Sequence, residues 1–195
     1  MKERRVVVTG IGSLTPIGNN TKDYWTALKE GKSGAAPITH FNAENFKTKF
    51  ACEVKNFDPK DYLDRKEARK LDKFTQYAMV VAEEAMKMSK IDREKINLEK
   101  AGVIWGSGIG GMTTFYNGCV DFGVGNGTPR FNPFFIPKLI SDIPAGHISI
   151  KYNFKGPNFT TVSACASSTN AIIDAFNYIK WNKADVFVTG GSEAT

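Results

Sequence analysis

The sequence predicts an α/β fold in which helices cover both faces of a sheet. Three short segments are almost wholly apolar and rich in β-branched residues: 5–10, 101–105 and 185–191. Between them, apolar residues recur at helical spacing. Strands that are apolar on both faces and alternate with helices are typical of a sheet buried on both sides.

The N-terminal half begins with the expected buried strand at 5–10, which leads into a turn-rich loop. Thr21 is placed to cap a helix that ends near Gly31. Residues 32–62 carry scattered prolines and aromatics without periodicity, which predicts an irregular excursion. From 66 to 88, apolar residues fall at helical spacing and predict one long helix.

The remaining elements alternate more regularly. A strand at 101–105 ends in a glycine-rich loop, and the following residues are expected to be helical. The expected elements are the strand 101–105, the loop 106–111, a helix over 112–123, a glycine-rich loop over 123–130, a helix over 140–152, a strand at 159–162, a helix over 170–179 and a strand at 185–191.

Composition narrows the class of protein. Of the 195 residues, 42% are apolar and 24% charged, which favours a globular chain and disfavours disorder. No run is long enough to span a bilayer, and residues 1–5 lead straight into a strand, which predicts neither a membrane segment nor a secretory signal. Cys52, Cys119 and Cys165 lack metal-ligand spacing, so we expect reduced thiols in the cytoplasm and no metal site.

The net charge of +6 suits nucleic acid or an acidic protein partner. Aromatic residues are not interleaved with the basic ones as on a base-stacking surface, so nucleic-acid binding is disfavoured.

Cys165 is the strongest candidate for chemistry. It lies in a cluster of small residues between the strand at 159–162 and the helix after it. Unpaired N–H groups and the positive end of the dipole at a helix N-terminus favour a thiolate, and small neighbours let a bulky acyl group approach. A lone cysteine among small residues is also a common packing residue, so position alone leaves both interpretations open.

Other chemistries have weaker support. Residues 106–111 match G-x-G-x-x-G, but Gly118 and the glycine-rich stretch at 123–128 interrupt the unit that a dinucleotide site needs. The segment is better interpreted as a tight loop where backbones approach closely. His147 lies in an apolar helix and, with His40, is expected to be structural, so a partner base for Cys165 has to come from elsewhere.

Taken together, several segments resemble the β-ketoacyl-[acyl carrier protein] synthases of the bacterial type II system, over essentially the whole chain. Each match is weak alone, but all occur in order. The matching segments are Val7–Gly12, Arg65–Phe74, Gly106–Gly111, Pro133–Pro137, Ala145–His147, Gly156–Pro157, Ser163–Ser168 and Val188–Ala194.

The resemblance implies a thiolase-like fold: two similar halves, each a mixed five-stranded sheet with helices, in five alternating layers. Residues 1–195 match an incomplete N-terminal half. By the same resemblance, Cys165 is the acyl-accepting nucleophile at the start of a buried helix, and its backbone N–H forms part of the oxyanion hole. The implied reaction is a decarboxylating Claisen condensation with malonyl-[acyl carrier protein] in fatty-acid elongation.

The resemblance also assigns binding residues. Ile109 matches a position against the acyl tail, and Phe134 and Phe135 match a segment at a homodimer interface that lines the partner's acyl pocket. A basic surface that docks acyl carrier protein is implied at Lys66, Arg69, Lys70 and Arg130. The substrates travel on the carrier protein's phosphopantetheine, so no cofactor of the chain's own is implied.

The family's active-site histidines, a lysine and a gating phenylalanine come from its second half, and none has a matching position here. The last strand of the first half also has no match. We therefore expect the 195-residue chain to be inactive alone. Three interpretations stay open: an enzyme, a non-catalytic partner subunit like the chain-length factors, and an inactive structural fragment. Chain-length factors lack the nucleophilic cysteine, so Cys165 favours the enzyme.

Overall fold

The computed structural model describes residues 4–128 and 131–194, and its central feature is a three-stranded parallel sheet. The strands lie in the order β4 (Asn158–Thr161), β3 (Ala101–Gly106) and β5 (Val186–Gly191). All six residues of β3 are buried, as its unbroken apolar sequence predicts. The α/β prediction is therefore confirmed. In the part of the chain that is described, this sheet has three strands, all parallel, where the resemblance implied a mixed sheet of five.

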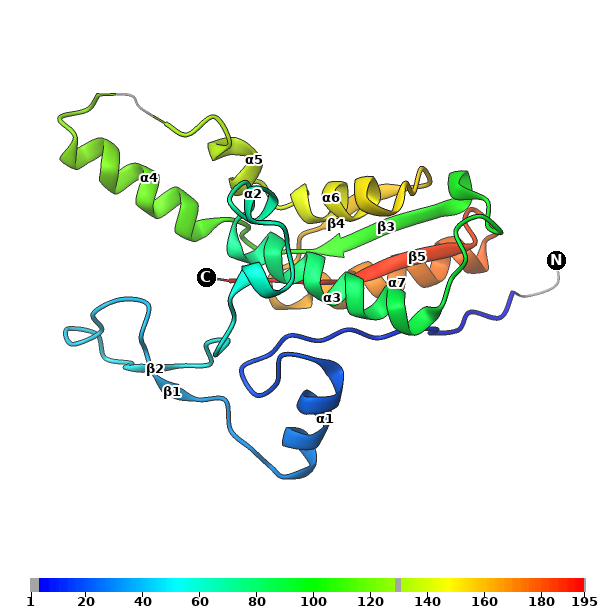
Figure 1. Ribbon diagram of the computed structural model, residues 1–195, viewed down its shortest axis with the longest axis horizontal. Helices are drawn as coiled ribbons and strands as arrows, with labels where there is room; N and C mark the ends of the chain where they lie inside the picture. The colour runs from blue at the N-terminus through cyan, green and yellow to red at the C-terminus, as the bar shows by residue number, and fades with distance from the viewer. Residues whose placement is uncertain (1–3, 129–130, 195) are drawn as a thin grey trace.

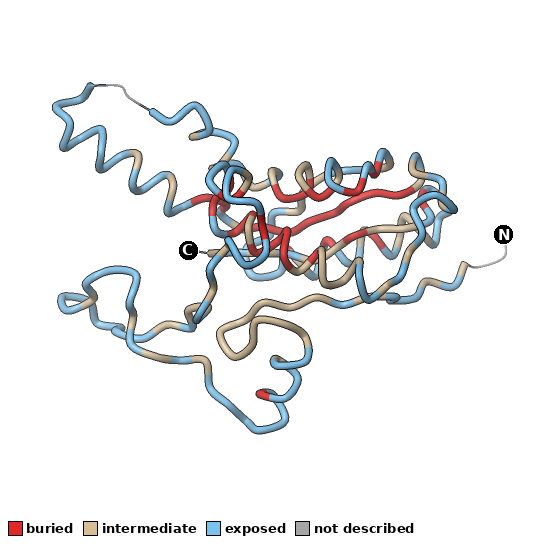
Figure 2. The backbone as a smooth tube through the Cα atoms, viewed as in Figure 1, coloured by how far each residue is buried: buried red, intermediate tan, exposed pale blue. Residues whose placement is uncertain are grey.

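Helices cover both faces of this sheet (Figure 1). On one face, α7 (Ser167–Lys180) places Ala171 and Ala175 against Ile104 of β3. On the other face lie α3 (Lys73–Ser89) and α6 (Ile143–Tyr152). The main core fills the space on that second face and includes Met79, Val103, Trp105 and Ile148 (Figure 2).

The helix expected over 66–88 is divided in two. A short helix, α2 (Arg65–Ala68), ends before Asp72, whose side chain accepts a hydrogen bond from the Phe74 N–H and caps α3. Capping by Asp satisfies an N–H that otherwise has no partner in the first turn. The apolar spacing continues through the break, which is why the sequence pattern predicted one helix.

The strand expected at 5–10 is wrong. Among the described residues, this segment pairs with no strand, and Val7 and Val8 are 55% and 81% exposed. It runs along α3 instead, where Gly10 and Gly12 allow close approach: a Cβ on either would lie 2.0 Å from a carbonyl oxygen of that helix. β3 pairs directly with β5, so the segment does not lie between these two strands.

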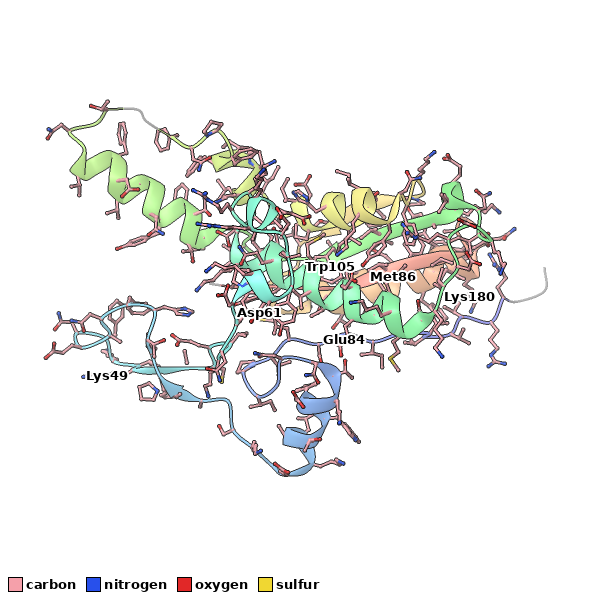
Figure 3. All side chains as sticks on the ribbon, viewed as in Figure 1. Lys49, Asp61, Glu84, Met86, Trp105 and Lys180 are labelled. Atoms are coloured by element: carbon pink, nitrogen blue, oxygen red, sulfur yellow. The ribbon has the colours of Figure 1, made fainter. Side chains whose placement is uncertain are left out.

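Side chains fasten this N-terminal segment to the body. The Arg4 guanidinium donates to the Asp185 carboxylate and the Ala184 carbonyl, at 2.8 and 3.0 Å. The Glu84 carboxylate accepts from the Ser13 and Thr21 N–H groups at 2.9 and 2.8 Å, and Figure 3 shows Glu84 on the side of α3 that faces this segment. The segment is therefore anchored by polar contacts rather than by sheet pairing.

The peripheral elements project from the body (Figure 1). Asn20, rather than the expected Thr21, caps the first helix by accepting from the Asp23 N–H. The projecting elements are α1 (Thr21–Lys29), the hairpin β1 (Ala36–Pro37) and β2 (Phe50–Ala51), α4 (Met112–Val124) and α5 (Phe135–Leu139). Two 3₁₀ turns contact elements of the body: η1 (Pro59–Asp61) precedes α2, and η2 (Leu98–Lys100) leads directly into β3.

We refer to 112–140, which contains α4 and α5, as the arm. No residue of α4 or α5 is buried, although α4 is mostly apolar. The helix expected over 112–123 is confirmed, and so is the one expected over 140–152, which begins at Ile143.

Candidate active site

The carboxyl ends of the three parallel strands meet at one edge of the sheet. Gly106, the last residue of β3, is in register with Thr161 at the end of β4 and with Gly191 at the end of β5. Three loops therefore converge there: 107–111, 162–166 and 192–194. This edge is where parallel α/β sheets most often place ligands and reacting groups.

Cys165 lies in this convergence, in the 3₁₀ turn η3 (Ala164–Ala166) that leads directly into α7. Its side chain is exposed, so the position is that of a presented thiol rather than a core residue. No side chain caps the start of α7. Unpaired N–H groups and the positive end of the helix dipole therefore face the region of the thiol.

Ser167 holds the cysteine turn in shape. Its hydroxyl donates to the Ala164 carbonyl at 2.7 Å and accepts from the Ser163 N–H at 2.9 Å. Ala164 has a φ of 51°, in the left-handed region that L-residues other than glycine seldom occupy. The strained residue next to Cys165 is therefore fixed by a side chain that is itself buried.

Glycines let α7 approach the sheet closely at this point. A Cβ on Gly106 would lie 2.4 Å from the Ser167 carbonyl carbon and the Ser168 nitrogen. A Cβ on Gly191 would lie 2.5 Å from the Ser168 Cβ. The prediction that 106–111 is a tight loop of close backbone approach is confirmed, and the G-x-G-x-x-G match reflects packing.

Ile109, expected against the acyl tail, lies in the loop after β3 and is half-exposed. Its N–H and that of Gly108 both donate to one oxygen of the Glu193 carboxylate, at 3.0 and 2.7 Å. Sequence reasoning missed Glu193 and Ser167 as site residues. The signal for Glu193 was a carboxylate two residues after the Gly-Gly pair that ends a strand.

The structure places Phe134 and Phe135 on the arm rather than at the cysteine. Phe134 is exposed and the Lys70 ammonium lies 5.5 Å from its ring centroid, while Phe135 packs against Phe131. Among the described residues, no hydrogen bond, ion pair or ring contact joins either phenylalanine to Cys165. Their acyl-pocket role across a dimer interface stays a prediction.

The basic residues do gather on one surface. Lys66, Arg69 and Lys70 are exposed, on α2 and the turn that follows it. Arg69 also lines a cleft of about 640 Å³ beside α5, together with the cationic side chains of Lys60, Arg65 and Lys138. The fourth expected docking residue, Arg130, lies outside the described residues.

The helix that follows Cys165 is less buried than the resemblance implied. The resemblance implied a buried helix after Cys165, but Ile172, Ile173 and Phe176 on the outer face of α7 are exposed, because nothing in the described chain covers that face.

His147 is half-buried on α6, where burial lowers the pKa of its imidazole. His40 lies on an exposed loop 3.7 Å from Glu53.

In residues 4–128 and 131–194, no helix is both long and apolar enough to cross a bilayer. Within the same residues, no three His, Cys, Asp or Glu side chains lie close enough together to hold a metal ion.

Comparison with known proteins gives a consistent result. Residues 3–195 match the family model described as "Beta-ketoacyl synthase, N-terminal domain". The chain is 44% identical over 196 residues to 3-oxoacyl-[acyl-carrier-protein] synthase 2 of Staphylococcus aureus (strain COL), which covers 99% of this chain and 46% of the relative. The corresponding Synechocystis protein is 40% identical over 194 residues, covering 100% and 46%. The chain thus spans about half the length of the curated relatives it matches.

Solved structures share the fold. A chain of "the ishigamide ketosynthase/chain length factor" superposes with a TM-score of 0.91 at 24% identity, covering 99% of this chain and 48% of that one. A β-ketoacyl synthase from Burkholderia phymatum gives 0.83 at 25%, covering 98% and 47%. A type II polyketide acyl-carrier protein complexed with its ketosynthase also gives 0.83 at 24%, covering 98% and 51%.

Proposed function

Because this chain belongs to the β-ketoacyl synthase family, as its N-terminal domain, we propose that it supplies the nucleophile of a 3-oxoacyl-[acyl carrier protein] synthase. The observation that carries the proposal is Cys165: an exposed thiol on a strained turn at a helix N-terminus, where three strands end. Presenting a nucleophile on such a turn is a recurrent solution in enzymes that form acyl intermediates.

The proposed chemistry has two stages. The Cys165 sulfur attacks the carbonyl of an acyl thioester, a C–S bond forms, and the phosphopantetheine thiol of the carrier protein leaves. Malonyl-carrier protein then loses CO2, and the resulting carbanion attacks the acyl-cysteine, releasing the Cys165 thiolate and a chain two carbons longer. The backbone N–H of Cys165 stabilises the tetrahedral oxyanion in both transfers. The reaction uses no cofactor held by this chain.

A second half is needed for the condensation. The family's histidines, which stabilise the malonyl thioester oxygen during decarboxylation, have no counterpart in this sequence. The exposed outer face of α7 supports the same conclusion, since Ile172, Ile173 and Phe176 form an apolar surface. The 195-residue chain is therefore proposed to accept an acyl group and not to condense it.

The proposed carrier-protein partner rests on charge. A carrier protein of acidic surface fits Lys66, Arg69 and Lys70, which lie exposed beside a cleft lined by further cations.

Homodimerisation through the arm is supported by its exposed apolar side chains, Phe134 among them. Three free cysteines support a reducing, cytoplasmic location.

Intact-mass measurement tests the proposal. The chain and its Cys165→Ala variant are incubated with acyl-loaded carrier protein, and circular dichroism confirms that both are folded. A mass increase equal to the acyl group in the wild-type chain, absent in the variant, is the expected result. A folded wild-type chain that gains no acyl mass would exclude the proposed first stage for this chain.

One alternative has a specific observation behind it. The solved structures of similar fold include a ketosynthase/chain length factor pair, and a chain-length factor is a non-catalytic subunit. The exposed Cys165 argues against that role, because a subunit that transfers no acyl group has no use for a presented nucleophile.

A further inference from the structure

One carboxylate joins two of the three loops around Cys165. An oxygen of Glu193, two residues after β5, accepts hydrogen bonds from the Gly108 N–H at 2.7 Å and the Ile109 N–H at 3.0 Å. Hydrogen bonds to an ionised acceptor are shorter and stronger than neutral ones. The loop after β3 is therefore tied to the loop after β5 across some 85 residues of sequence.

The base of Glu193 is itself fixed. The preceding residue, Ser192, donates its backbone N–H to the Gly106 carbonyl at 3.1 Å. The Ser192 hydroxyl accepts from the indole N–H of Trp105 at 3.0 Å, and Trp105 is buried in the centre of the body (Figure 3). Because Trp105 belongs to the core, Glu193 extends from a rigid support rather than from a free end.

The loop that Glu193 holds lies against the cysteine turn. A Cβ on Gly108 would lie 3.2 Å from the Glu193 carboxylate and 3.5 Å from the Cα of Ala164, the residue before Cys165. On the other side of Ile109, Gly110 has a φ of +83° and the Gly111 N–H donates to the Leu139 carbonyl at 2.9 Å. Ile109 thus lies between two anchored points, in a loop whose Gly108 lies against the residue before Cys165, and its side chain is half-exposed.

We propose that Glu193 is a positioning residue: by holding the backbone of Gly108 and Ile109, it fixes the Ile109 side chain and so sets which acyl lengths Cys165 accepts. The proposal deepens the proposed function and rests on it for the identity of the acyl group. Its geometric part, the restraint of the loop by one carboxylate, stands on the two hydrogen bonds that Glu193 accepts from Gly108 and Ile109.

Hydrogen exchange tests the restraint. In Glu193→Ala, the amides of the 107–111 peptide are expected to exchange about tenfold faster, because a hydrogen bond to a charged acceptor is lost; tenfold corresponds to about 1.4 kcal/mol. Glu193→Gln keeps an acceptor oxygen and is expected to retain most of the protection. Glu99→Ala is the matched control, because Glu99 is an exposed carboxylate ahead of the opposite end of β3. Unchanged exchange in Glu193→Ala overturns the proposal.

Alkylation tests the consequence for acyl length. The rates of reaction of Cys165 with iodoacetamide and with N-octyl iodoacetamide are compared by peptide mass spectrometry, and exposed Cys52 and Cys119 report intrinsic reagent reactivity in the same sample. The quantity compared is the rate of reaction with N-octyl iodoacetamide divided by the rate with iodoacetamide. In Glu193→Ala, this ratio at Cys165 is expected to approach the ratio at the two reference cysteines, and in Glu193→Gln it is expected to return to the wild-type value. A ratio at Cys165 that does not change reduces Glu193 to a structural contact and refutes the proposal.

These readouts separate the two hypotheses, because neither needs a carrier protein. A chain that takes up no acyl group in the mass measurement refutes the proposed function. Exchange and alkylation that do not respond to Glu193 refute the positioning role, whatever the mass measurement gives.

Discussion

Replacing Ser167 by alanine is expected to destabilise the chain through the cysteine turn. The Ser167 hydroxyl is a partner for both the Ser163 N–H and the Ala164 carbonyl, and the residue is 4% exposed. A buried polar group left without a partner costs about 1–3 kcal/mol. Allowing partial rescue by water, we expect a loss of about 2 kcal/mol, which lowers the melting temperature of a chain of this size by roughly 4–8 °C.

The assay is thermal unfolding followed by circular dichroism, with Ser168→Ala as the matched control. Ser168 is the neighbouring serine, and no described residue forms a hydrogen bond with its side chain, so its replacement is expected to change stability by less than about 0.5 kcal/mol. If Ser167→Ala melts at the temperature of Ser168→Ala, the turn is not held by this hydroxyl.

A second substitution examines the strain that the hydroxyl supports. Ala164 has a φ of 51°, and a non-glycine residue held there costs of order 1 kcal/mol. Ala164→Gly in the Ser167→Ala background is therefore expected to recover part of the lost stability. A double variant less stable than Ser167→Ala alone would contradict the strain argument.

Three further predictions concern the frame of the site. Neighbouring lysines and a tyrosine hydroxyl lower the pKa of Glu83 from 4.5 to about 2. The contribution of the Glu83 carboxylate to folding stability is therefore present above pH 4.5 and is lost as the pH falls toward 2. The fall in melting temperature between these pH values is expected to be smaller in Glu83→Gln than in the wild-type chain. Gly106→Ala is expected to lower the free energy of unfolding by about 1–3 kcal/mol, because the new Cβ would meet backbone atoms. Gly123→Ala, where the new Cβ lies in open space on a helix, is expected to raise it by about 0.5–1 kcal/mol. Equal urea midpoints for the two variants would contradict this difference. Asp72→Ala removes the cap of α3 and the carboxylate that accepts from the Thr114 N–H and hydroxyl. We expect a loss of about 2 kcal/mol in the free energy of unfolding and faster hydrogen exchange at the start of α4. Wild-type protection at the start of α4 would refute the proposed connection between Asp72 and this helix.

Much of the sheet was predictable from sequence because burial and composition agree there. All six residues of β3 are buried, as its unbroken apolar run predicts. The run at 5–10 has the same composition, yet it pairs with nothing. Composition indicates that a segment suits a sheet, whereas pairing depends on which strand lies beside it, and that is a long-range property.

The residues of the candidate site also differ in whether local sequence or long-range contacts determine their roles. Cys165 was predictable because a strand, small residues and a helix follow one another locally in the sequence. Glu193 was not, because its role depends on contacts with residues 84 and 85 positions away. Ser167 was hidden among other small residues, because only its burial and the two hydrogen bonds of its hydroxyl distinguish it from its neighbours.

The unpaired segment at 5–10 also affects how the chain behaves in solution. Within residues 4–128 and 131–194, its backbone N–H and C=O groups have no sheet partner, and the outer edge of β5 is likewise open. Open edges with apolar side chains recruit strands from other molecules. At high concentration the isolated chain is therefore expected to self-associate edge to edge, and a short peptide able to add one strand would keep it dispersed.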